Sequence, residues 1–136
     1  MNPAHCVESY RLWDIVTQWA RETLQHEIVM ARVLAKGVVR DGLRAQSVDP
    51  RWLSQGTFEL RGLPLVGYVA RDGQLPIFIR SAALNHLRAV VENAATPNPQ
   101  LLFDEFVTRQ DFRAWLQQAG IEAPLFWFDI NERAMA

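Results

Sequence analysis

The chain has 136 residues, of which 49% are hydrophobic and 21% are charged, and its formal net charge is −1. A chain of this length can bury enough surface to fold as one domain without disulfides or a metal. The near-zero net charge disfavours a protein coated in positive charge for nucleic acid or a membrane. We therefore expect a single domain over residues 1–136, with residues 1–6 and 129–136 frayed.

Cysteine content and the N-terminal sequence predict the cellular location. Cys6 is the single cysteine, so no intramolecular disulfide can form, whereas small secreted domains more often carry paired cysteines. The first ten residues have no basic segment followed by an apolar one, so no signal peptide is expected. No apolar run reaches the ~20 residues that a membrane span needs. These features predict a cytoplasmic protein of a bacterium, with no membrane partner.

Two helices are predicted at the start of the chain. Residues 8–25 carry apolar side chains at steps of three and four, which places them on one helix face. That face comprises Tyr10, Trp13, Val16, Trp19, Ala20, Thr23 and Leu24. Residues 27–44 carry a second stripe and contain two glycines, either of which could end the helix. The stripe comprises Ile28, Ala31, Leu34, Ala35 and Val38, and the glycines are Gly37 and Gly42. Because one or two residues separate the helices, we expect a helical hairpin.

The middle of the chain is predicted to be β-rich. Residues 45–56 are interpreted as a connector that Trp52 and Leu53 attach to the core. Short β-rich runs follow at residues 57–61, 65–70 and 76–80. Asp72 and Gly73 lie between the last two runs, and an Asp-Gly pair supplies the positive φ angles of a tight hairpin turn. We expect a small antiparallel sheet of two or three strands.

Two further helices are predicted after this sheet. The first is expected to begin with Ser81 as its cap and to end near residue 93. Residues 101–107 could hold a short strand. Thr108 and Asp111 then form a start similar to a capping box for a helix that ends at Gly120.

The C-terminal aromatic residues are expected to be largely internal. The last predicted helix buries Phe112, Trp115 and Leu116, and residues 124–128 are too apolar for a free tail. The fold class is therefore α+β, with an N-terminal helical hairpin, a small antiparallel sheet of two or three strands and two further helices.

No familiar catalytic or metal-binding motif is present in the sequence. It has no Gly-x-Ser-x-Gly turn, no His-x-x-x-His pair, no cysteine pair and no Gly-rich phosphate loop. No cofactor or metal is expected, and an enzyme is not favoured. An enzyme would have to assemble dispersed residues, of which the candidates are His26, His86, Asp104 and Glu105.

The most specific pattern is basic. Arg32, Lys36, Arg40 and Arg44 recur every four residues, so a continuous helix would carry them as one stripe. Residues 32–61 contain six basic and three acidic side chains, whereas residues 92–136 contain three basic and seven acidic ones. The stripe is either a surface for phosphate, nucleic acid or an acidic partner, or a solvated helix face.

A DNA-reading helix-turn-helix matches this pattern poorly. A turn at Gly37 would place Arg32 and Lys36 where that motif needs apolar packing residues. It would also leave only residues 38–44 for the second helix. Nucleic-acid binding is therefore an alternative that the pattern does not favour.

Aromatic side chains offer a second kind of candidate surface. Trp is enriched in binding hot spots, and Trp52 and Trp127 lie outside the predicted helix faces. The leading hypothesis is a non-catalytic protein-interaction module, with a homodimer as one form, that uses these two residues and the basic stripe. The alternatives are a nucleic-acid-binding accessory protein that uses the stripe, and an enzyme with dispersed residues.

Overall fold

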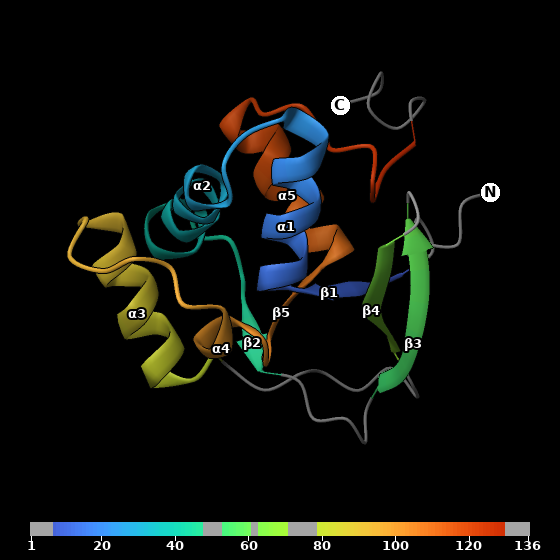
Figure 1. The fold of residues 1–136 in the computed structure, drawn as a ribbon, viewed down its shortest axis with the longest axis horizontal. Helices are drawn as coiled ribbons and strands as arrows, with labels where there is room; N and C mark the ends of the chain where they lie inside the picture. Colours follow the sequence, from blue (N-terminus) through green and yellow to red (C-terminus); the bar gives the residue numbers. More distant parts are fainter. Residues whose placement is uncertain (1–6, 48–52, 61–62, 71–78, 130–136) are drawn as a thin grey trace.

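The computed structural model describes residues 7–47, 53–60, 63–70 and 79–129, and Figure 1 traces its elements. The helices α1, α2, α3 and α5 gather at one end of the molecule, and the hairpin of β3 and β4 stands at the other (Figure 1). The α+β class is confirmed. Trp52 lies outside the described residues, as do the predicted turn at Asp72 and Gly73 and the predicted frayed residues 1–6 and 130–136.

The described strands form one antiparallel sheet in the order β2-β5-β1-β4-β3. Their bounds are Ser9–Arg11 (β1), Gln46–Ser47 (β2), Leu53–Leu60 (β3), Leu63–Ala70 (β4) and Glu105–Thr108 (β5). Among the described residues the sheet therefore has five strands, more than the two or three expected. The additional strands are short segments that pair across long sequence distances. Tyr10, for example, pairs with both Gly67 and Val107.

Several predicted strand and connector boundaries are wrong. Residues 45–56 are not a continuous connector, because β2 begins at Gln46 and β3 begins at Leu53. β3 pairs with β4 along its whole length, from Leu53 with Ala70 to Leu60 with Leu63, so the hairpin precedes the predicted one. The run predicted at residues 76–80 is not a strand at Ile79 or Arg80, and its other residues are not described.

The N-terminal helical hairpin is confirmed with shorter helices. α1 spans Leu12–Thr23, because residues 9–11 pair in β1 instead of extending the helix. Leu24 ends α1 in the left-handed region with φ 58° and is 92% exposed, so its predicted place on the apolar face is wrong. α2 spans Glu27–Arg40.

The ends of α2 follow from local chemistry. His26 Nδ1 accepts a hydrogen bond of 3.0 Å from the backbone N–H of Ile28, which caps the first turn. The helix continues through Gly37 and stops before Gly42, whose φ is +78°. Gly42 is therefore the glycine at which the helix terminates, because a residue without Cβ adopts the left-handed region at little cost.

The third helix begins at the residue predicted as its cap, one residue earlier than expected. α3 spans Ser81–Val91, so Ser81 is its first helical residue and Arg80 occupies the cap position with extended backbone. A short helix, α4 (Pro99–Leu102), stands where a strand was expected to begin. The Asn98 side chain accepts a bond from Gln100 N and caps it.

The final helix matches its prediction. α5 spans Arg109–Ala119, and Thr108 Oγ1 accepts a hydrogen bond of 3.1 Å from Asp111 N. Gly120 ends the helix with φ 70°. Phe112, Trp115 and Leu116 are buried, as expected.

The segment after α5 packs against the rest of the chain, which confirms the prediction for residues 124–128. The carboxylate of Glu22 in α1 accepts hydrogen bonds from the backbone N–H groups of Leu125 and Phe126. Trp127 is fully buried, and its Nε1 donates to Val7 O over 2.8 Å. The Trp127 ring also contacts Tyr10 and Phe112. Trp127 is thus part of the core of its own chain and presents no surface to a partner. The prediction that it is a binding residue is therefore wrong.

Within the part of the chain that the structure describes, no helix is both long and apolar enough to cross a lipid bilayer.

Candidate functional site

The predicted basic stripe lies on the surface. Arg32, Lys36 and Arg40 are exposed on α2, and four-residue spacing puts them on one helix face. Arg44 is exposed too, but it lies beyond the end of α2, so the prediction of one helical stripe of four is wrong at this residue. We refer to Arg32, Lys36, Arg40 and Arg44 as the basic face.

The cations of the basic face form no ion pair with their described neighbours. Ion pairs between described residues include those of Arg11 with Asp14 and of Arg80 with Asp104 and Glu105. No ion pair joins a residue of the basic face to another described residue. The face therefore attracts negative charge, and salt weakens this attraction because the cations are exposed.

One exposed apolar residue precedes the basic face on α2, and another lies in the link before this helix. Val29 is 45% exposed and lies one turn before Arg32 and two turns before Lys36 on α2. Leu24, at 92% exposure, lies in the short link that precedes α2. On this face of α2, an exposed apolar residue thus precedes the cations.

Among the hollows that border α2 in the described part of the chain, two include residues beyond its first turn. The first has a volume of about 400 Å³ and includes the apolar residues Trp19, Met30, Val33 and Ile121. Its remaining lining residues are Glu22, Thr23, Gln25 and Glu122. We call it the apolar hollow. The second has a volume of about 390 Å³ and is lined by Lys36, Arg40, Asp41, Trp115, Gln118 and Ala119. We call it the basic hollow.

The basic hollow depends on close contact between α2 and α5. A Cβ atom added to Gly37 would lie 2.7 Å from two carbons of the Trp115 ring, so only glycine permits this approach. Trp115 Nε1 donates to Asp41 Oδ2 over 3.4 Å. These contacts hold the Trp115 ring beside Lys36 and Arg40.

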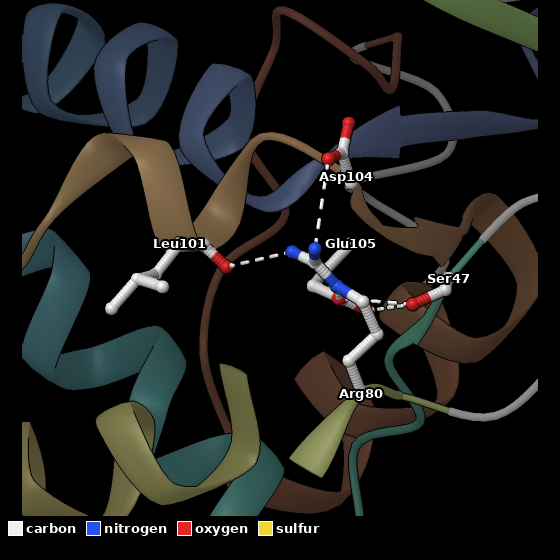
Figure 2. A network of polar contacts seen from close by, with 5 residues as sticks. All are labelled: Ser47, Arg80, Leu101, Asp104 and Glu105. Atoms are coloured by element: carbon white, nitrogen blue, oxygen red, sulfur yellow. Dashed lines mark hydrogen bonds and ion pairs between the residues drawn. The ribbon is translucent and has the colours of Figure 1, made fainter. Parts of the chain in front are cut away.

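A second polar cluster surrounds Glu105 of β5 (Figure 2). The Glu105 side chain is fully buried, and both of its oxygens accept from Ser47 Oγ of β2, at 2.9 and 2.8 Å. Arg80 Nε donates to Glu105 Oε1 over 2.5 Å. Arg80 also lies 3.7 Å from Asp104 and reaches Leu101 O over 3.5 Å.

This cluster satisfies a buried carboxylate and links separate elements. Burial of an unpaired carboxylate is costly, and the donors from Ser47 and Arg80 offset that cost. The hydrogen bond to Glu105 raises the pKa of Arg80, which remains charged. Because the three residues come from β2, β5 and the start of α3, the cluster ties these elements together.

The four dispersed candidates for catalysis fall into separate places. Asp104 and Glu105 meet at Arg80. His26 caps α2, and His86 Nε2 accepts from Asn98 N over 2.9 Å. Burial lowers the pKa of His86, which favours the neutral ring that this hydrogen bond requires. Each histidine thus has a local structural role.

Within the parts of the chain that the structure describes, no group of three or more His, Cys, Asp or Glu side chains is placed to hold a metal ion. Comparison with known protein families, curated proteins and solved structures finds no match to this chain. The candidate site therefore consists of the basic face and the two hollows beside it.

Sequence reasoning found the cations of this site but missed its apolar part. Trp19 and Met30 are nearly buried and belong to the core, and Ile121 follows the glycine that ends α5. No spacing rule connects Ile121 to α2. The four-residue repeat of basic residues was the available signal, and it identified Lys36 and Arg40.

Proposed function

We propose that this chain is a non-catalytic protein-interaction module that binds an acidic protein partner through its basic face. The observation that carries the proposal is the exposure of Arg32, Lys36, Arg40 and Arg44 without an ion pair to another described residue. Complementary charge accelerates encounter and selects partners of the opposite sign. Arginine favours such a role because its planar group binds carboxylates with two parallel hydrogen bonds.

The composition of the surface supports a protein partner over a nucleic acid. Phosphate contacts require cations and polar groups, whereas Val29 adds exposed apolar area one turn from Arg32. Apolar area surrounded by charge is typical of protein interfaces. The net charge of −1 also gives little general attraction to a polyanion. The proposal keeps the cytoplasmic location, where a chain with one cysteine needs no oxidising environment.

A titration with two polyanions tests this proposal. The probes are a fluorescent poly-glutamate peptide and a duplex DNA, each measured at about 50 mM and about 200 mM salt. We expect the peptide to bind and to weaken with salt. The triple variant Arg32→Glu, Lys36→Glu and Arg40→Glu should lose this binding. The matched control is Arg88→Glu, which reverses an exposed charge on α3 and should leave binding unchanged.

Two outcomes would overturn the proposal. The first is no peptide binding at low salt, or binding that the triple variant retains. The second is a clear preference for DNA that the triple variant abolishes, which would favour the nucleic-acid alternative. Sedimentation of the free chain during the same series reports self-association, because a homodimer built on this face would dissociate in the triple variant.

A further inference from the structure

The apolar hollow and the basic hollow border the same helix. Met30 and Val33 belong to the first and Lys36 and Arg40 to the second, and these residues follow one another at spacings of three and four. Such spacings place neighbours on one side of a helix. A ligand that lies along α2 can therefore contact apolar and basic groups together.

We propose that the partner contributes an acidic segment with one bulky apolar side chain. This inference rests on the proposed function. The apolar side chain enters the apolar hollow, and the carboxylates meet Lys36 and Arg40. Peptide segments commonly bind grooves in this way, with one anchor residue in a pocket and charged residues at its edge.

The apolar hollow has the properties of a preformed anchor site. Trp19 and Met30 are 3% and 6% exposed, so their positions are set by the core and not by a ligand. Val33 and Ile121 are half-buried and pack against that core. A volume of about 400 Å³ is within the usual range for small binding pockets. An apolar side chain can thus enter without rearrangement of the walls.

The helix rise sets the spacing between the anchor and the acidic residues. At about 1.5 Å per residue, Lys36 lies about 4.5 Å and Arg40 about 10.5 Å along α2 from Val33. An extended segment advances about 3.3 Å per residue. Its acidic residues should therefore lie about one to three positions from the anchor.

Acidic side chains of the protein around the hollows determine on which side of the anchor the partner's carboxylates lie. Glu22 and Glu122 line the apolar hollow. The Glu22 carboxylate already accepts two backbone hydrogen bonds from the segment after α5. Additional carboxylates there would be repelled, so those of the partner should lie toward Lys36 and Arg40. Asp41 also lines the basic hollow, and its bond from Trp115 Nε1 engages one of its oxygens.

Short labelled peptides test this inference by fluorescence anisotropy. Each peptide has a Ser-Gly background, one Phe and three adjacent Glu residues, which are placed before the Phe in one peptide and after it in another. A third and a fourth peptide replace the Phe with Ala. We expect at least one Phe peptide to bind about tenfold more tightly than its Ala counterpart, a difference typical of a buried anchor side chain.

Two matched protein variants locate the anchor. Val33→Ser removes an apolar wall of the hollow, and Val39→Ser makes the same change at another half-buried position of α2 that lines neither hollow. Val33→Ser should weaken the Phe peptide about fivefold and leave the Ala peptide unchanged. Val39→Ser should leave both affinities within about twofold. Circular dichroism and melting temperatures verify that both variants fold.

The outcomes separate this inference from the proposed function. Binding that depends on Lys36 and Arg40 but not on the Phe or on Val33 would overturn the inference and leave the proposed function standing. Equal losses in Val33→Ser and Val39→Ser would also overturn it, because the effect would then be one of stability. No binding by any peptide, together with a failed poly-glutamate titration, would overturn both.

Discussion

The substitution Gly37→Ala has two opposing effects on the stability of the fold. Alanine in place of glycine inside a helix usually raises stability by about 1 kcal/mol, through backbone entropy and helix propensity. Here the added Cβ would lie 2.7 Å from two ring carbons of Trp115 and 3.0 Å from its Nε1. The sign of the result depends on whether the Trp115 ring can move.

The surroundings of Trp115 indicate that it cannot move freely. Ordinary contact begins at 3.4 Å, so the ring must shift by about 0.7 Å relative to α2. The ring is 3% exposed and contacts Trp19 and Phe112, with centroids 6.2 and 5.7 Å away. Overpacking of this kind costs about 1–3 kcal/mol. With the propensity gain subtracted, we expect Gly37→Ala to lower the free energy of unfolding by about 1 kcal/mol.

Urea denaturation followed by circular dichroism measures this change. A loss of about 1 kcal/mol corresponds to a fall of about 3 °C in melting temperature for a chain of this size. In a Trp115→Leu background the clashing atoms are absent, so Gly37→Ala should become stabilising. The coupling between the two substitutions should then be about 2 kcal/mol. Gly42→Ala is the control, because nothing lies within 4 Å of its added Cβ and its cost arises from φ +78° alone.

A gain of about 1 kcal/mol in Gly37→Ala would refute the steric argument, because helix propensity alone would then explain it. A loss that persists unchanged in the Trp115→Leu background would also refute it. Such a result would show that the cost does not arise at the ring of Trp115. The loss of stability caused by Gly42→Ala should be the same in the unmodified chain and in the Trp115→Leu background.

Four further predictions concern single residues. Thr108→Ala should lower the free energy of unfolding by about 1 kcal/mol in urea, because it removes the cap of α5, and an unchanged midpoint would contradict this. Arg80→Met should cost about 3 kcal/mol, since it leaves buried Glu105 without its cation, while Arg80→Lys should cost less. The pKa of His86 is lowered by folding, so its contribution to stability is complete above pH 6.5, the ordinary value, and falls as the pH drops toward the folded pKa. His86→Gln should therefore flatten the acid side of a stability–pH profile, and an identical profile would contradict the role of His86. Leu24→Gly should raise stability by about 1 kcal/mol by relieving a left-handed leucine, and should weaken binding to the poly-glutamate probe less than the triple charge reversal does.

The sequence alone was sufficient where structure depends on neighbouring residues. The cap at Thr108, the glycine that ends α5 and the helical hairpin all follow from contacts within a few positions along the chain. The exposed cations of α2 follow from the same local rule, because an apolar stripe on one face leaves the opposite face to solvent. The packing of residues 124–128 on the domain followed from their composition.

Only the tertiary structure decided features that join distant segments. β1 and β2 contain three and two residues, too few for an alternating pattern, and they exist because β5 pairs with both. The sequence gives no sign that Glu105 is buried, yet its carboxylate lies in the interior, where Ser47 and Arg80 donate hydrogen bonds to it. The apolar hollow likewise combines residues of α1 and α2 with Ile121. Such sites depend on side-chain packing between elements, for which a sequence pattern carries no local signal.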